Sequence, residues 1–362
     1  MSDVYCPICD RRINWTATPP YRIGAQGQAE LLVQDSLESE ASWRDRLTMA
    51  YRPCGEVGQA GTHLLPYDYA DYTPVTIGMI GHSKAGKTHL LAAMISRLCS
   101  NDPVLDRLGL RVSPLDLAVH QRYVTEYITP LILHRTELAG TPATAVIEFC
   151  DALKVTNAEN RSFAVTFFDL AGERLARPNN EEVRFYASAK ALVFVVDPES
   201  LPKRAEPRTA GDASFEVALR RLGSRPRPSA TEAFHPVAAA VVVAKADLIR
   251  FEDRLVSDWL ALGSAEEEVE LRTVERESED VYAYLTQRGA AQWLRPAQEC
   301  YRSTLHFASA TNSQAAERNQ ATQRIFPGAF RQCRVLKPLL AVFAMTGILD
   351  ESALLPSSEE PR

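Results

Sequence analysis

Residues able to bind phosphate, a divalent cation and a purine base stand at the ends of apolar runs in this sequence. The first group matches the phosphate-loop pattern G-x-x-x-x-G-K-[ST] at every position; its residues are Gly81, His82, Ser83, Lys84, Ala85, Gly86, Lys87 and Thr88. A β-branched apolar run, 75–80, precedes it, and apolar residues at helical spacing follow it. These patterns predict a strand, a phosphate-binding turn and a helix, with a plain glycine-rich turn as the alternative.

The chemistry of phosphate binding explains the spacing within 81–88. Gly81 and Gly86 allow a tight turn, so that backbone N–H groups converge on phosphate oxygens at a helix N-terminus. Lys87 adds a positive charge for the β- and γ-phosphates, and the Thr88 hydroxyl is placed to bind Mg²⁺.

A second group, Asp169 to Glu173, follows the apolar run 162–168 and contains D-x-x-G. Asp169 can hold Mg²⁺ through water, and the Gly172 amide can reach a γ-phosphate. The D-x-x-G pattern alone is common, but here it follows a phosphate loop by one pair of predicted strands. We expect the loop after Gly172 to be ordered only while a γ-phosphate is present.

A third group, Ala244-Lys245-Ala246-Asp247, follows the buried run 237–243. The Asp247 carboxylate can accept hydrogen bonds from N1–H and the 2-amino group of guanine, and the Lys245 stem can cover the ring. Adenine lacks these donors, so guanine is the predicted base. After the last predicted strand, 303–307, Ser309 and Ala310 can present backbone N–H groups to the guanine O6.

Composition limits the classes of protein. The chain has 362 residues, 46% of them hydrophobic, which allows one large α/β domain and a smaller one. No apolar run is long enough to span a membrane, and the first residues lack the pattern of a secretory signal, so we expect a cytoplasmic protein. The net charge of −6 gives no indication of nucleic-acid binding. Four scattered cysteines are predicted to be small buried hydrophobes: Cys99, Cys150, Cys300 and Cys333.

The N-terminal segment carries a possible zinc site. Cys6 and Cys9 form C-x-x-C, the spacing that offers two thiolates to a tetrahedral Zn²⁺. Cys54 and His63 are the candidates for the other two ligands. The second knuckle is incomplete, because the position three residues before Cys54 is Tyr51. A degenerate ribbon that has lost its metal is the alternative.

We therefore expect three regions: a zinc-ribbon-like segment and linker at 1–70, a nucleotide-binding domain at 71–350 with an insertion at 101–140, and a disordered tail at 351–362. Ser113 is the expected N-cap of a helix that ends near 134, and 143–150 pairs with 162–168 as a hairpin. Amphipathic helices are expected within 29–50 and over 334–349. The acidic stretch 266–280 is expected to be a solvated helix face.

The order of the four motifs over 73–348 resembles the translation-factor-like and Ras-like P-loop GTPases. The C-x-x-C segment, the long insertion and the phrase 167–173 look like bacterial GTPases of the double-GTPase type, thought to act in multi-gene conflict or defence systems. The resemblance implies a three-layer α/β fold with a six-stranded, mostly parallel sheet containing one antiparallel strand. It also implies a GTP/GDP switch that uses Mg²⁺.

The chain departs from the family pattern at several positions. Ala244 stands where asparagine or threonine is usual, so one polar tie to the phosphate loop is missing. Glu173 stands where many members have a water-orienting glutamine, which predicts slow hydrolysis. Arg174 and Arg177 are either an arginine finger in cis or solvated residues. Lys84 either replaces a bound monovalent cation or points to solvent, and the switch threonine is Thr141 or Thr144.

Two functions follow from the residues and the resemblance. The first is a GTP-binding switch with slow Mg²⁺-dependent hydrolysis, in which Lys87 and Glu173 act on the reaction and a protein effector reads the switch loops. The alternative is a nucleotide-bound scaffold for protein interactions with little or no hydrolysis. An ATP-using kinase or ATPase is disfavoured by Lys245 and Asp247.

Overall fold

The computed structural model describes residues 4–6, 9, 11–24, 28–59, 61–100, 102–139, 147–170, 185–186, 188–202, 211–223, 233–262, 270, 272–317 and 324–350. Within these residues, seven strands form the main sheet, in the order β13-β12-β11-β7-β10-β9-β8. Their bounds are β7 Thr73–Ile80, β8 Arg111–Pro114, β9 Ile147–Thr156, β10 Ser162–Leu170, β11 Ala189–Val196, β12 His235–Val243 and β13 Cys300–Phe307.

The main sheet is parallel except at one strand. β7 pairs in parallel with β10 and β11, and β12 joins β11 to β13 in the same direction. β9 is antiparallel to both β10 and β8. The predicted α/β class is confirmed, including the single reversed strand, but the predicted number of six strands is wrong because β8 adds a seventh.

β8 also corrects the predicted helix start. Ser113 and Pro114 are the end of an edge strand, not an N-cap and first turn. The helix α4, Leu117–Tyr123, begins three residues later, and Asp116 is its N-cap, accepting from the Val119 amide at 3.0 Å. It continues as a π-helix, Val124–Leu133, that contains Pro130. Because proline has no N–H to donate, this stretch departs from regular α-helical bonding.

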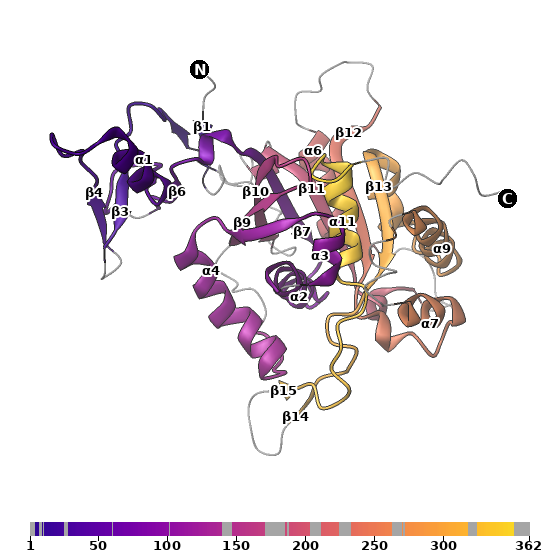
Figure 1. Cartoon of the computed structure of the whole chain (residues 1–362). Coiled ribbons are helices and arrows are strands. Elements are labelled where there is room, and N and C mark those ends of the chain that lie inside the picture. Colours follow the sequence, from indigo (N-terminus) through magenta and orange to yellow (C-terminus); the bar gives the residue numbers. More distant parts are fainter. Residues whose placement is uncertain are drawn as a thin grey trace.

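Helices cover both faces of the sheet. One apolar cluster joins alternate residues of the central strands to α2, Lys87–Cys99, and α11, Leu336–Met345. The other cluster lies on the opposite face with α6 Ala213–Gly223, α7 Arg254–Ala261 and α9 Thr273–Gln287. Figure 1 shows α2 and α11 in front of the strands. The result is a three-layer arrangement. The remaining short helices are α3 Pro103–Arg107 and α10 Arg295–Glu299, and the 3₁₀ turns are Tyr69–Asp71, Pro198–Ser200, Ala246–Leu248 and Ala291–Leu294.

The N-terminal region forms small sheets of its own. β1 Val4–Tyr5 pairs with β2 Arg12–Ile13, and a second sheet has the order β4-β3-β5-β6. Its strands are β3 Tyr21–Ile23, β4 Ala29–Leu31, β5 Tyr51–Pro53 and β6 Leu64–Pro66, with the helix α1, Glu40–Thr48, between β4 and β5. The prediction of helix within 29–50 is therefore right for 40–48 and wrong for 29–31. In Figure 1 these N-terminal strands and α1 lie to the left of the main sheet.

Burial corrects the predictions for α11 and for one cysteine. All ten residues of α11 are buried, so the helix is a core helix and not an amphipathic one. Cys150, Cys300 and Cys333 are buried as predicted, but Cys99, the last residue of α2, is exposed.

The acidic stretch contains a buried carboxylate, contrary to the predicted solvated face. Glu277 on α9 is fully buried; its carboxylate lies 2.9 Å from His306 Nδ1 and 2.7 Å from Arg334 Nη2. It also accepts the Phe307 amide at 3.1 Å, at the end of β13. Although burial opposes ionisation, the charges of His306 and Arg334 lower the pKa of Glu277 to about 2. This cluster fixes α9 and the chain before α11 to the end of β13.

We predict that Glu277→Gln lowers the free energy of unfolding by about 3–5 kcal/mol at pH 7, because it leaves Arg334 buried without its counter-charge. The carboxylate's contribution is complete above the ordinary glutamate pKa of about 4.3 and is lost as the pH falls towards about 2. Chemical denaturation should therefore show a smaller difference from wild type at pH 3 than at pH 7. Glu279→Gln, two residues away and exposed, is the control and should change little. A Glu277→Gln protein as stable as this control would contradict the interpretation.

Candidate functional site

The phosphate loop joins the end of β7 to the start of α2. Gly86, the N-cap of α2, has a φ of +93°, a left-handed conformation that glycine adopts without strain. A Cβ on Gly81 would lie 2.7 Å from the carbonyl oxygen of Val195, on the neighbouring strand β11. The two glycines therefore stand where the backbone requires them, one for its conformation and one for its close approach.

The two residues at the start of α2 point their polar groups back towards the loop and the sheet. Lys87 is buried, and its Nζ donates to the carbonyls of Gly81 at 2.8 Å and His82 at 2.9 Å. The Thr88 hydroxyl donates to Asp169 Oδ2 at 2.8 Å. The two predicted magnesium ligands, from α2 and from the end of β10, thus lie together. Both offer oxygen, the donor atom that Mg²⁺ prefers.

The predicted base-recognition residues are adjacent to one another. Asp247 accepts a hydrogen bond from the Ser309 hydroxyl at 2.5 Å, and the Ala246 amide donates to Ala308 at 3.1 Å. Lys245 has a φ of +48°, and its stem lies against the phosphate loop, since a Cβ on Gly86 would be 3.6 Å from Lys245 Cε. The ends of β12 and β13 therefore form one surface beside the phosphate loop.

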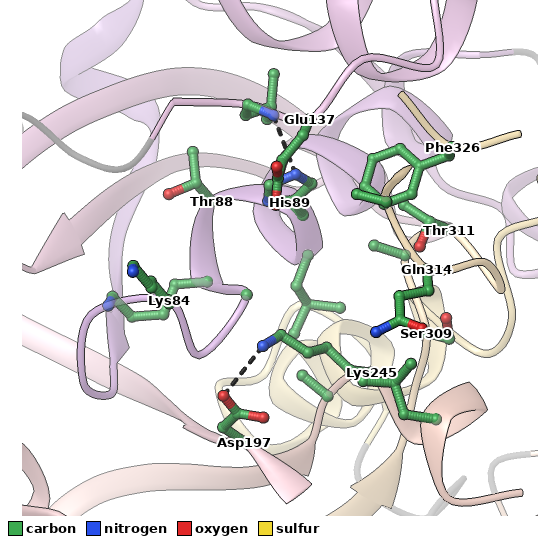
Figure 2. Close-up of a pocket in the computed structure, with 18 of the residues that line it drawn as sticks. Lys84, Thr88, His89, Glu137, Asp197, Lys245, Ser309, Thr311, Gln314 and Phe326 are labelled. Carbon is green, nitrogen blue, oxygen red and sulfur yellow. Dashed lines mark hydrogen bonds and ion pairs between the residues drawn. The ribbon is translucent and has the colours of Figure 1, made fainter. Parts of the chain in front are cut away.

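A cavity of about 810 Å³ lies between these elements, and most of the predicted site residues line it: His82, Ser83, Lys84, Gly86, Lys87, Thr88, Lys245, Asp247, Ser309 and Ala310. Figure 2 shows Lys84 and Thr88 on one side and Lys245 and Ser309 on the other. Gly81, Ala85 and Asp169 are buried and are not among the lining residues. Lys87 and Asp247 thus share one cavity, although their roles stay predictions.

Acidic residues that the motifs did not predict also belong to this site. Asp197 follows β11 and accepts from Lys245 Nζ at 3.0 Å, with Glu199 3.5 Å from the same nitrogen. Asp212 accepts the His82 amide at 3.0 Å. These contacts link the base-recognition segment and the phosphate loop to neighbouring elements. They are present even though Ala244 has no polar side chain with which to contact the phosphate loop. The signal for Asp197 was its position directly after a buried run, because the carboxyl ends of parallel strands meet at one edge.

His89, directly after Thr88, was also missed. Burial, and then the charge of Lys245, lower the pKa of His89 to about 4, so its ring is neutral at physiological pH. Its Nε2 accepts the Leu138 amide at 3.1 Å, which places the proton of the neutral ring on Nδ1. Gly172, Glu173, Arg174, Arg177, Thr141 and Thr144 lie outside the described residues, and the predictions made for them remain predictions.

The four predicted zinc ligands come together at the N-terminal end of the protein. Their donor atoms lie within 4.8 Å of one another. Cys9 Sγ is 3.7 Å from Cys54 Sγ, and His63 Nδ1 is 3.6 Å from Cys6 Sγ and 3.5 Å from Cys54 Sγ. A tetrahedral Zn²⁺ with ordinary bond lengths requires S···S separations of about 3.8 Å and S···N separations of about 3.6 Å. The residues therefore fit a Cys₃His zinc site, in spite of the incomplete second knuckle.

Comparison with known proteins finds one family model and one curated relative, each of which matches part of the chain. The family model described as Double-GTPase 2 matches residues 140–295, a range that includes Asp169, Lys245 and Asp247 and begins after the phosphate loop. The "Putative ESX-1 scaffolding and assembly protein SaeC" of Mycolicibacterium smegmatis is 24% identical over 224 residues, which are 57% of this chain and 55% of the relative. The chain thus spans about half the length of this relative.

Among solved structures, the bacterial selenocysteine-specific elongation factor EF-Sec matches with 14% identity and a TM-score of 0.27, over 66% of this chain and 26% of the elongation factor. Separately, the described helices include none that is both long and apolar enough to cross a bilayer.

Proposed function

We propose that this chain is a P-loop GTPase of the double-GTPase type, and that it binds GTP and GDP with Mg²⁺ in the cavity between the phosphate loop and Asp247. The observation that carries the proposal is that Lys87 and Asp247 line the same cavity. Its volume of about 810 Å³ falls within the usual range for ligand pockets, about 300–1,000 Å³.

The phosphates bind at the N-terminus of α2. Lys87, which contacts the Gly81 and His82 carbonyls here, turns to the β- and γ-phosphates and stabilises the charge that develops there during hydrolysis. Thr88 and Asp169, whose side chains are hydrogen-bonded to each other here, would hold Mg²⁺ beside the phosphates, Asp169 through water. The ion supplies Lewis-acid charge at the phosphates when bound.

The base binds at the ends of β12 and β13. Asp247 accepts the N1–H and 2-amino donors of guanine, and the hydrogen bond from Ser309 holds its carboxylate in place. The Lys245 stem covers the ring, and the backbone N–H groups of Ser309 and Ala310 face the O6. A purine without both donors covers the half-buried Asp247 carboxylate and leaves it partly unpaired, which is the physical basis of the selectivity.

The chain hydrolyses GTP slowly, because Glu173 replaces the glutamine that orients water in many relatives. A protein effector reads the nucleotide state through the segment after Gly172, and the resemblance to double-GTPases suggests a bacterial conflict or defence system. One observation favours the scaffold alternative: the curated relative is described as a scaffolding and assembly protein. In that case bound nucleotide organises the surface, and hydrolysis is of little importance.

The second site binds a structural Zn²⁺ through Cys6, Cys9, Cys54 and His63. Cys6 and Cys54 also pack in an apolar cluster with Leu115 of the insertion and with Ala152 and Ala164 of the main sheet. The metal therefore stabilises the part of the N-terminal region that contacts the edge of the nucleotide-binding sheet.

For base recognition, we expect the full chain with Mg²⁺ to bind GTP and not ATP, and Asp247→Asn to bind GTP about 100-fold more weakly, since two hydrogen bonds to a charged acceptor are lost. XTP should bind the variant better than the wild type, because xanthine presents an acceptor where guanine has its 2-amino donor. Titration with fluorescent nucleotides measures both. Asp258→Asn, at an exposed ion pair on α7, is the matched control. Equal affinities for GTP and ATP in the wild type would refute the guanine site.

For hydrolysis, Lys87→Ala should reduce the single-turnover rate of GTP cleavage about 100-fold or more, because the charge on the transferring phosphoryl group is lost. Quench measurements at saturating enzyme separate this rate from nucleotide affinity. The exposed Lys190→Ala is the control and should cleave at the wild-type rate. Identical slow rates in wild type and Lys87→Ala would favour the scaffold over the switch.

For the metal, mass spectrometry of the purified protein should find about one zinc ion per chain. Cys54→Ser should lose most of the zinc and unfold at a lower temperature, because binding energy is also folding energy. Cys99→Ser changes an exposed cysteine and should keep both the metal and the stability. Wild-type protein that neither contains zinc nor takes it up would show that the cluster is a ribbon without metal.

A further inference from the structure

Two segments far apart in the sequence pair with each other at one wall of the nucleotide cavity. The Glu137 amide donates to the Arg324 carbonyl at 2.9 Å, and the Phe326 amide donates to the Arg135 carbonyl at 2.8 Å. Thr136 and Ile325 form an antiparallel bridge between these bonds. We call residues 135–139 and 324–326 together the clamp. Glu137, Leu138, Ala139, Arg324 and Phe326 all line the cavity, and none belongs to the main sheet.

Side chains on both sides of the clamp reinforce the backbone pairing. Leu138 and Phe326 are buried together with Ala92 and Leu131 in a separate apolar cluster. Arg324 lies 3.0 Å from Glu137, but both side chains are partly exposed, so this ion pair contributes little. The apolar contact and the backbone hydrogen bonds therefore contribute most of the stability of the clamp.

His89 attaches the clamp to the phosphate-binding helix. It is the residue after Thr88 on α2, and its Nε2 accepts the Leu138 amide at 3.1 Å (Figure 2). The edge of the ring also contacts Phe326, with centroids 5.8 Å apart and an interplanar angle of 86°. One side chain thus touches both segments of the clamp from the element that carries Lys87 and Thr88.

We propose that His89 is a positioning residue that keeps the clamp closed over the bound nucleotide, so that opening of the clamp limits how fast the nucleotide leaves. The inference rests on the proposed nucleotide site and adds a determinant of release to it. Without the imidazole acceptor, the Leu138 amide loses its partner beside an apolar cluster, which destabilises the closed clamp relative to the open one. The base and phosphate contacts themselves are unchanged.

The test measures dissociation of a fluorescent GDP analogue from the full chain with Mg²⁺, chased by excess GDP. We expect His89→Leu to raise the dissociation rate about 5- to 100-fold, the range given by loss of one buried hydrogen-bond acceptor. His89→Gln, which can place an amide oxygen near the position of Nε2, should restore most of the slow release. The preference for GTP over ATP should stay the same in both variants, because neither touches the base.

Phe326→Ala is the second variant, and it loosens the clamp from its other segment. It should also accelerate release, and the double variant with His89→Leu should be less than additive, because both changes open the same clamp. Wild-type release rates in both single variants would overturn the clamp and leave the nucleotide site standing. A wild-type chain that does not bind the GDP analogue would overturn the nucleotide site and, with it, the clamp.

Discussion

The parallel pairing of the five adjacent strands β13, β12, β11, β7 and β10 is the constraint on which the candidate site depends. In a parallel sheet all carboxyl ends lie at one edge, so each strand delivers the residue that follows it to the same place. β7 delivers the phosphate loop, β10 ends in Asp169, β12 leads to Lys245 and Asp247, and β13 leads to Ser309. The register keeps these ends level: Met79 lies beside Asp169, and Val243 beside Phe307. Residues more than 200 positions apart in the chain therefore line one cavity.

The polar groups of the site form hydrogen bonds and ion pairs with one another, and a bound ligand could replace these contacts. Lys87 contacts loop carbonyls, and Lys245 contacts Asp197 and Glu199. The hydroxyl of Thr88 donates to Asp169, and that of Ser309 donates to Asp247. A nucleotide with Mg²⁺ offers phosphate oxygens to Lys87 and N–H donors to Asp247, so it can replace the contacts of these two residues with stronger, charge-assisted ones. The acidic residues near Lys245 keep its side chain placed beside the phosphate loop.

The sequence predicted the parts of the fold that have local signals. Apolar runs that end in glycine, aspartate or lysine located the central strands and the residues after them, because burial on both faces gives a continuous apolar pattern. β8 was missed because its pairing with β9 is a long-range contact, and Ser113-Pro114 has the local pattern of a helix start. Glu277 was misjudged because its partners, His306 and Arg334, lie 29 and 57 residues away. The clamp and His89 likewise depend on contacts between distant segments. At the N-terminus, all four residues of the Cys/His cluster were named from the sequence, but only Cys6 and Cys9 have a standard local spacing, because the fold is what brings Cys54 and His63 to them.

The most direct test of the central claim, that one guanine nucleotide spans the separate strand ends, is a crystal structure of the full chain with GDP and Mg²⁺. We predict density for a single nucleotide in the cavity, with its phosphates at the N-terminus of α2, the metal beside Thr88 and Asp169, and the base edge on Asp247. A nucleotide bound elsewhere, or one whose phosphates occupy the loop while the base points away from Asp247, would contradict the claim.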